Sequence, residues 1–423
     1  DPGISCRLPV HRRVDVPDRV PAEAVRDPEQ AVNRDAEPGR SFPGFLIAVE
    51  RFLKQVREWR LMLAAGRHAL TAGLLVLALA GCNRVPELVE VAAMDQAPGN
   101  ITVTPDKRII FSLHQFFEPE WRVAEWTADG LQPFPTLDIA SGNDLDVTLH
   151  SVLGIQSDSQ GIVWMLDNGM RGGAVPRLVA WDTRKDGLHR IITLPQPVTP
   201  PDAFVNDLAV DELNQKIFIS DPAGGDNAAL IVVDIASGEA RRVLQGHQSV
   251  VPEDIDMIIE GEPVEIRQED GSTVRPRVGV NPIALDVNSE WLYYGPMHGT
   301  SMYRIRVSDL IGTDADLLAD KVERYGRKPI SDGISIDNDG NIYLTDVVNN
   351  AIGLIDRSTE YRIYLADPRL SWPDALSFGP DNRLYTVSNQ LHRSAVLHAG
   401  VETAAPPFYI FSFDPLADGV SGR

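Results

Sequence analysis

Short apolar stretches separated by polar turns recur along most of the chain. Each of six segments contains a polar loop, an apolar stretch, a turn with Asp, Asn or Gly, and a second apolar stretch; they begin at Gly99, Ser151, Asn206, Asn281, Asp332 and Asp374. The equivalent apolar positions are separated by 52, 55, 75, 51 and 42 residues, at Val103, Ile155, Val210, Leu285, Ile336 and Phe378. Paired short strands with periods of about 40–50 residues are typical of β-propellers. The pattern predicts an all-β fold, a six-bladed β-propeller.

Other apolar runs supply the remaining strands. Residues 177–182 and 230–234 lie between the repeats and are expected to form outer strands of their blades. The one long spacing contains residues 262–278, which we interpret as an added hairpin around Asp270 and Gly271. The run 408–413 is a strand candidate that would close the ring beside residues 87–91.

Composition and charge narrow the function classes. The chain has 423 residues, 33 Gly and 31 Pro, and a formal net charge of -21. Residues 1–61 have a net charge of +1 (11 basic, 10 acidic), whereas residues 83–423 have -23 (27 basic, 50 acidic). Because phosphates would be repelled by such an acidic domain, we expect no nucleic-acid partner. With no amphipathic helix or coiled coil for association, a monomer is expected.

A targeting signal is expected at residues 62–82. Arg67 and His68 precede an apolar run from Leu70 to Ala80, and Leu-Ala-Gly-Cys ends at Cys82. The run is shorter than the about 20 residues that a membrane span needs. It resembles a bacterial lipobox, so Cys82 is the expected lipidation site; the alternative is a buried apolar helix that ends in a chance cysteine. We therefore expect an exported lipoprotein at the cell envelope, anchored to the membrane through its lipid only.

This reading divides the chain into three parts. Residues 1–61 lack Met and precede the export signal, so we interpret them as an over-extended or disordered N-terminal segment and Met62 as the true start. Residues 62–82 are the lipoprotein signal peptide, and residues 83–423 form the propeller domain.

Several runs resemble the Yellow/major royal jelly protein family. They are residues 164–169, 176–182, 204–211, 230–250, 331–346 and 367–392, together with the inserted hairpin. The resemblance covers nearly all of the domain, from about Glu87 to Phe413. It implies a secreted six-bladed propeller with a ligand site at one mouth of the central tunnel. It implies little about a reaction, since insect members are assigned to pigment chemistry, amine binding or nutrition.

The repeat register indicates where that site lies. Loop positions four residues before the apolar anchors converge around a propeller axis; here they are Gly99, Ser151, Asn206, Asn281, Asp332 and Asp374. Ca²⁺ takes 6–8 oxygen ligands of these types. The set also resembles gluconolactonase-type propellers, which hold a divalent ion with one Glu, two Asn and one Asp. Asn206, Asn281 and Asp332 match the two Asn and the Asp, but Gly99 stands where the Glu would be. Asp207 is expected to point one step off the ring, and turn chemistry alone remains the alternative.

Two function classes follow. In the first, a divalent cation, preferably Ca²⁺, assists the hydrolysis of lactones or small esters, with Asp332 or Asp374 as general base. In the second, the mouth is a pocket that binds an aromatic or amine ligand without turnover. Its walls would include Trp164, Tyr294, His298 and Trp372. A further alternative is that the protein is a dopachrome-conversion-like isomerase. No GxSxG, CxxC or phosphate-loop motif supports a serine-hydrolase, zinc or nucleotide site.

Overall fold

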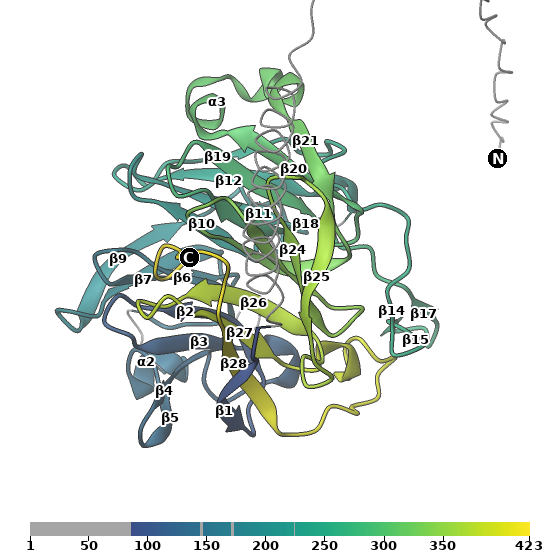
Figure 1. Ribbon diagram of the computed structural model, residues 1–423. Coiled ribbons are helices and arrows are strands. Elements are labelled where there is room, and N and C mark those ends of the chain that lie inside the picture. Colours follow the sequence, from purple (N-terminus) through teal and green to yellow (C-terminus); the bar gives the residue numbers. More distant parts are fainter. Residues whose placement is uncertain (1–85, 144–146, 171–172, 224) are drawn as a thin grey trace, which may run out of the picture. The chain divides into compact units, whose positions relative to one another are not determined.

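Strands arranged around a central axis dominate the computed structural model (Figure 1). It describes residues 86–143, 147–170, 173–223 and 225–423. The predictions for residues 1–61 and 62–82, including Cys82, lie outside the described residues. Among those described, no helix is both long and apolar enough to cross a membrane.

Six four-stranded antiparallel sheets form the blades within this part of the chain. Their inner strands are β2 (Pro98–Val103), β6 (Val152–Ser157), β10 (Leu208–Asp211), β18 (Val280–Leu285), β22 (Ser331–Ile336) and β26 (Pro373–Phe378). The second strands are β3 (Ile109–Leu113), β7 (Ile162–Asp167), β11 (Lys216–Asp221), β19 (Trp291–Pro296), β23 (Ile342–Asp346) and β27 (Leu384–Ser388). The third are β4 (Val123–Thr127), β8 (Arg177–Asp182), β12 (Ala229–Asp234), β20 (Ser301–Arg306), β24 (Ala351–Ile355) and β28 (Phe408–Phe413). The outer are β5 (Gly130–Pro133), β9 (Gly187–Thr193), β13 (Ala240–Val243), β21 (Glu323–Arg327), β25 (Tyr361–Ala366) and β1 (Val89–Met94). The expected six-bladed propeller is confirmed.

The two ends of the domain meet in the last blade. β1 pairs with β28 in antiparallel register from Val89 opposite Ser412 to Met94 opposite Phe408. The strand expected at 408–413 is therefore present, and it pairs with residues 89–94. This pairing supplies the fourth strand of a sheet that would otherwise expose the edge of β28.

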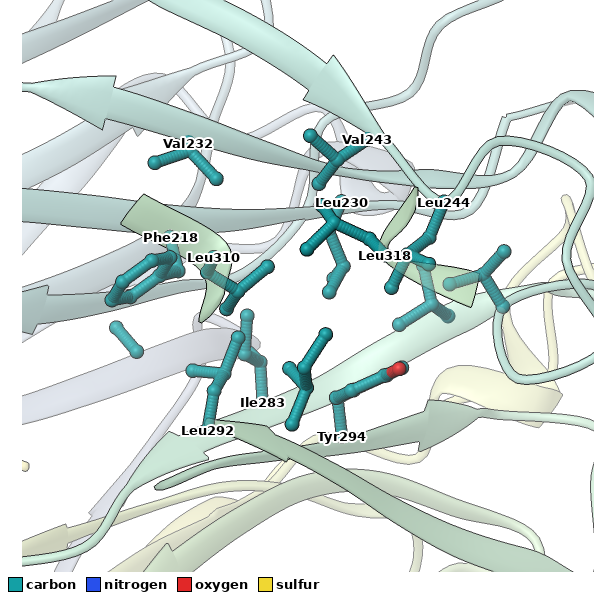
Figure 2. Close-up of a cluster of buried hydrophobic side chains, with 14 of the residues drawn as sticks. Phe218, Leu230, Val232, Val243, Leu244, Ile283, Leu292, Tyr294, Leu310 and Leu318 are labelled. Carbon is teal, nitrogen blue, oxygen red and sulfur yellow. The ribbon is translucent and has the colours of Figure 1, made fainter. Parts of the chain in front are cut away.

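The core lies between neighbouring blades. Side chains along a strand alternate between its two faces, and β19 shows the consequence. Leu292 and Tyr294 face the third blade, where they join the cluster around Phe218 and Leu230 (Figure 2). Tyr293 faces the fifth blade with Ile334 and its neighbours. The short helix α3 (Val307–Gly312) caps the first of these clusters with Leu310.

A β-bulge recurs near the start of the inner strands. In β2, β6, β18, β22 and β26 the pairing register shifts so that two residues oppose one, after Pro98, Val152, Val280, Ser331 and Pro373. A bulge breaks the strict alternation of side chains between the two faces. It thereby allows a neighbouring pair of residues to approach the axis together.

The segment after β28 closes the opposite end of the tunnel. Thr102 Oγ1 donates to the Gly422 carbonyl at 3.0 Å, and Ser335 Oγ donates to that of Arg423 at 3.0 Å. The Arg423 guanidinium donates to the carbonyl oxygens of Asp286 at 3.1 Å and Val210 at 3.3 Å. These contacts all lie at the C-terminal ends of the inner strands, so the mouth at their N-terminal ends remains for a ligand.

Candidate functional site

A cavity of about 150 Å³ occupies the tunnel mouth at the N-terminal ends of the inner strands. Polar side chains from five blades border it: Asn100, Asn206, Asp207, Asn281, Asp332 and Asp374. The structure thus brings together the four residues Asn206, Asn281, Asp332 and Asp374 that the repeat register singled out. We call the six polar residues the floor of the cavity.

Three positions differ from the sequence-based register. In the second blade Leu153, not Ser151, borders the cavity, because the bulge in β6 follows Val152. The Ser151 amide instead donates to Asp167 Oδ1 at 2.9 Å.

In the first blade Asn100 borders the cavity one residue after Gly99. Asp207, expected one step off the ring, borders it beside Asn206, since two successive residues reach the axis before β10 begins. Sequence periodicity alone could not reveal either irregularity.

Hydrogen bonds tie the floor carboxyl groups to nitrogen donors. Asp332 Oδ2 accepts from Trp372 Nε1 at 2.7 Å, and its Oδ1 accepts from Asn281 Nδ2. Asp207 Oδ1 accepts from Asn100 Nδ2 at 2.9 Å and from the amide of Leu208 at 2.8 Å. Asp374 Oδ2 accepts from Asn389 Nδ2 at 2.6 Å. All these partners are neutral, and no Lys or Arg among the described residues forms an ion pair with the three carboxyl groups.

The floor therefore carries uncompensated acidity. Burial, together with the nearby charge of Asp374, raises the pKa of Asp207 to about 7. Burial also raises the pKa of Asp374 to about 7. The pKa of Asp332 is raised well above its usual range by burial and by the charges of Asp374 and Asp207. Repulsion among the three carboxylates is relieved when one of them is protonated or when a cation binds among them.

Two histidines border the same cavity as neutral rings. His298 Nδ1 accepts the amide hydrogen of Val278 at 3.1 Å, and His114 Nδ1 accepts that of Phe116 at 3.2 Å. An Nδ1 atom that accepts a hydrogen bond leaves the ring proton on Nε2. Burial lowers the pKa of His298 to about 4 and that of His114 to about 3, so both rings are uncharged near neutral pH.

The predicted aromatic walls divide into two groups. Trp372 and His298 border the cavity. Trp164 and Tyr294 do not, because each packs between blades. Trp164 lies in the cluster between the second and third blades, with its Nε1 3.3 Å from Asp158 Oδ2. Tyr294 lies between the third and fourth blades, with its hydroxyl 3.0 Å from Ser249 Oγ.

The walls come mainly from segments that the repeat analysis did not place at the site. Residues 257–278, the insertion before β18, fold into two small hairpins: β14 (Ile258–Ile259) with β15 (Glu262–Pro263), and β16 (Ile266–Arg267) with β17 (Thr273–Val274). The apolar lining comprises Phe116, Leu153, Phe204, Met257, Val264, Ile266, Pro276, Val278, Met297, Leu391 and Leu397. The sequence predicted the insertion but gave no indication that it reaches the axis.

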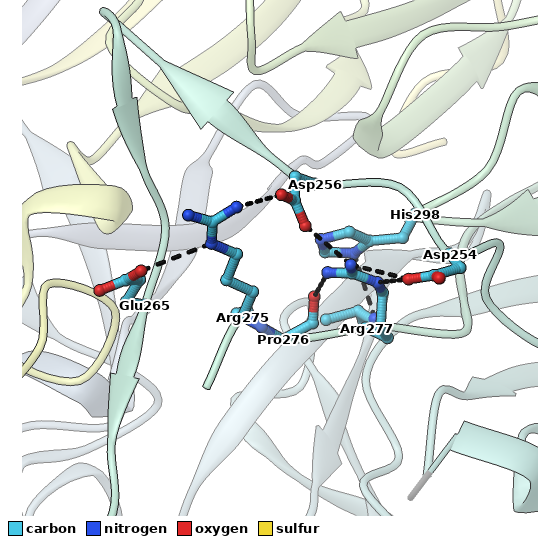
Figure 3. A network of polar contacts seen from close by, with 8 residues as sticks. Asp254, Asp256, Glu265, Arg275, Pro276, Arg277 and His298 are labelled. Atoms are coloured by element: carbon cyan, nitrogen blue, oxygen red, sulfur yellow. Dashed lines mark hydrogen bonds and ion pairs between the residues drawn. The ribbon is translucent and has the colours of Figure 1, made fainter. Parts of the chain in front are cut away.

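Ion pairs hold this insertion beside His298 (Figure 3). Arg277 donates to Asp254 Oδ1 at 2.8 Å and to Asp256 Oδ1 at 2.7 Å. Arg275 pairs with Asp256 and lies 3.4 Å from Glu265 Oε1. Exposed pairs of this kind contribute little stability singly, but a connected network fixes the geometry of a loop. The acidic residues at 253–265, followed by Arg275 and Arg277, are the sequence signal for it.

The donor atoms of the floor fit a divalent cation in part. Its carboxylate and carboxamide oxygens are the hard donors that Ca²⁺ prefers, and its negative charge lacks a partner. However, no three His, Cys, Asp or Glu side chains in the described ranges are arranged to hold a metal ion by themselves. The residues therefore fit a cation only if carboxamide oxygens, those of Asn206 and Asn281, complete the ligand set.

Comparison with family models identifies the relatives of this chain. The model described as "Major royal jelly protein" matches residues 150–404. The chain belongs to the major royal jelly protein family. The match confirms the resemblance read from the sequence, and it includes the insertion and floor residues from Asn206 to Asp374. No curated protein sequence matches the chain directly.

One solved structure supports the fold, and two others are reported for their likeness. A candidate gluconolactonase superposes with a TM-score of 0.50 at 14% identity, covering 80% of this chain and 95% of that one. A gluconolactonase from Xanthomonas campestris has a TM-score of 0.49 at 12% identity, covering 78% of this chain and 89% of that one. A luciferin-regenerating enzyme has a TM-score of 0.49 at 12% identity, covering 80% and 98%. At such identities the likeness extends to the architecture alone.

Proposed function

We propose that this protein is a hydrolase of lactones or small esters, with a divalent cation, preferably Ca²⁺, at the floor of the cavity. The observation that carries the proposal is a cluster of three carboxyl groups, Asp332 buried and Asp207 and Asp374 half-buried, which have raised pKa values and no cationic partner in the described part of the chain. Uncompensated charge in a cleft is expensive for folding and is typical of functional sites. The candidate gluconolactonase of similar fold motivates the choice of substrate class.

The residues take distinct roles in this proposal. Asn206, Asn281 and Asp332 would hold the cation, as the sequence comparison implied. When bound, it would polarise a carbonyl group or lower the pKa of a water molecule. Asp374 would accept the proton of the attacking water. Only its Oδ2 takes a hydrogen bond from the described residues, and a pKa of about 7 suits a general base at neutral pH.

Metal analysis and catalysis test the proposal together. We expect protein purified without chelator to contain a divalent metal, to melt at a lower temperature after EDTA treatment, and to hydrolyse a lactone in a pH-stat assay. Asn206→Ala and Asp374→Asn should each abolish hydrolysis. Asn214→Ala is the matched control, because Asn214 lies in the same blade as Asn206 but donates to Asp211 at 2.8 Å away from the cavity. No bound metal and no shift on chelation would refute the metal-assisted reaction.

A second candidate is a binding protein for a small organic amine. Two observations favour it: the apolar walls lead to an acidic floor, and no three acidic, His or Cys side chains of the described ranges converge on a metal. The ammonium group would then lie on the floor where the cation would otherwise bind. Saturable binding of an aromatic amine by metal-free protein, without turnover of any lactone, would favour this candidate. A dopachrome-conversion-like isomerase would use the same carboxyl groups for proton transfer and would show turnover of the aromatic ligand.

We also propose that the protein is exported, anchored by a lipid on Cys82, and monomeric. The apolar run that ends in Leu-Ala-Gly-Cys supports the export and anchoring. Metabolic labelling with a fatty acid should mark the native protein and not its Cys82→Ser variant. Light scattering of the purified domain tests the monomer.

A further inference from the structure

The cavity joins two features that together describe its ligand. Its walls are hydrocarbon and aromatic side chains, and they lie above a polar floor. Sugar lactones carry hydroxyl groups on nearly every carbon, and these walls would leave such groups without hydrogen-bond partners. Desolvating an unpaired hydroxyl is unfavourable, so the walls select a ligand with an apolar body.

His298 supplies the second feature. Its ring is completely buried, and its Nδ1 accepts from the Val278 amide at 3.1 Å, so Nε2 carries the proton. Nε2 has no hydrogen-bond partner among the described residues. A buried N–H without a partner is unusual in a folded protein and calls for an explanation. Because His298 borders the cavity, an acceptor atom of a bound ligand would supply the missing partner.

The surroundings keep this donor in place. The Arg277 ion pairs with Asp254 and Asp256 hold the chain that carries the Val278 amide. Besides burial, the nearby positive charges of Arg277 and Lys328 lower the pKa of His298, and Asp256 opposes them weakly. The ring therefore stays neutral, with one fixed tautomer, over the range in which the protein would work.

We infer that the site takes an ester or lactone with a hydrocarbon or aryl body, whose carbonyl oxygen accepts a hydrogen bond from His298 Nε2. This inference rests on the proposed function and specifies its substrate class. In the reaction, the oxygen of water bonds to the carbonyl carbon while Asp374 takes one proton from that water. The negative charge that develops on the carbonyl oxygen is stabilised by the N–H of His298. The bond between the carbonyl carbon and the ester oxygen then breaks, and the leaving alkoxide receives the proton from Asp374.

Two matched ligands isolate the contact with His298. Dihydrocoumarin has an aryl body and a lactone carbonyl, whereas chroman has the same bicyclic frame without the carbonyl. We expect both to bind in calorimetry to the metal-loaded Asp374→Asn protein, in which hydrolysis is abolished and dihydrocoumarin stays intact; the His298 variants are compared in this background. His298→Phe should weaken dihydrocoumarin binding roughly tenfold and leave chroman unchanged, since one hydrogen bond is lost. His298→Gln, which retains an N–H donor, should recover part of the loss. A structural defect would weaken both ligands equally and would overturn the role of His298.

Wall variants test the apolar body. Val264→Thr adds a hydroxyl to a buried wall residue of nearly the same shape, and we expect kcat/KM for dihydrocoumarin to fall roughly tenfold. Val274→Thr is the control, because Val274 lies on the same insertion but is 45% exposed. Melting temperatures of all four variants verify that they fold.

The outcomes separate this inference from the proposed function. If glucono-δ-lactone is hydrolysed as well as dihydrocoumarin or better, the apolar substrate class is refuted and the hydrolase stands. If dihydrocoumarin binds in a His298-dependent way but is not hydrolysed, the ligand class is supported and the hydrolase is refuted. If neither dihydrocoumarin nor chroman binds, the inference is overturned.

Discussion

Replacing Asp207 by Asn should stabilise the protein at alkaline pH. The raised pKa of Asp207 means that the folded protein binds its proton more tightly than the unfolded chain does. A change from 3.8 to about 7 corresponds to about 4 kcal/mol. Because the side chain is partly open to a cavity that water can enter, we expect about half of this, roughly 2 kcal/mol.

The sign follows from proton linkage. Below about pH 4 the carboxyl group is protonated in both states and imposes no penalty. As the pH rises from about 4 to about 7, the unfolded chain releases the proton first and the folded state loses stability; above about pH 7 the penalty is constant. Asn keeps an oxygen that can accept from the Leu208 amide but never ionises. The gain in Asp207→Asn should therefore be present at pH 8 and absent near pH 4.

Urea unfolding of metal-free protein at pH 8 and pH 4 measures both values. Asp234→Asn is the control of opposite sign: Lys216, at 2.5 Å, lowers the pKa of Asp234, so its replacement should reduce stability at pH 8. An Asp207→Asn variant that is no more stable than the wild type at pH 8, or that gains equally at both pH values, would refute the reasoning. It would show that the carboxyl group is solvated or neutralised in the folded state.

Three further changes have defined outcomes. Asp221→Asn should lower the free energy of unfolding by about 3–5 kcal/mol in urea, because it leaves the buried guanidinium of Arg242 without its ionic partner. Glu323→Gln, at an exposed pair, should cost less than about 1 kcal/mol. Gly333→Ala would place a Cβ 2.6 Å from the carbonyl oxygen of Asp374, and the resulting displacement of Asp374 should lower kcat/KM roughly a hundredfold. Gly312→Ala should leave kcat/KM unchanged, because no atom lies within 4 Å of a Cβ at that position. Phe411→Ala should cost about 3–5 kcal/mol by thermal or urea unfolding, since this ring is fully buried between the fifth and sixth blades; Ile363→Ala, 50% exposed, should cost much less. Equal effects of a variant and its control would contradict the corresponding argument.

The repeat pattern predicted the fold because it is a local property of the chain. Each blade is a set of short strands joined by turns, so the alternation of apolar and polar residues and the Gly, Asn and Asp of the turns are visible without tertiary contacts. The pattern also predicted the closing strand and the insertion. It identified Asn206, Asn281, Asp332 and Asp374 as residues near the axis, since equivalent positions of successive blades converge there.

Only the tertiary structure decided which side chains complete the site. A β-bulge leaves no mark in the hydrophobic period, so the repeat register pointed to Gly99 and Ser151, whereas Asn100 and Leu153 border the cavity. Asp207 was placed off the ring because periodicity does not show that two successive residues reach the axis before β10 begins. The sequence of a strand does not reveal whether an aromatic side chain lines the tunnel mouth or packs between two blades. Trp164 and Tyr294 were therefore assigned to the cavity wall, although both pack between blades.

The sequence shows that residues 83–423 are strongly acidic, but it does not show which of the acidic side chains lie at the site. Most acidic side chains stay in water, where neighbouring charges are screened. Three of them, Asp207, Asp332 and Asp374, lie together at one mouth of the tunnel, and residues of the 257–278 insertion border the same cavity. Burial and mutual repulsion, which exist only in the folded protein, turn ordinary carboxyl groups into the floor of a site.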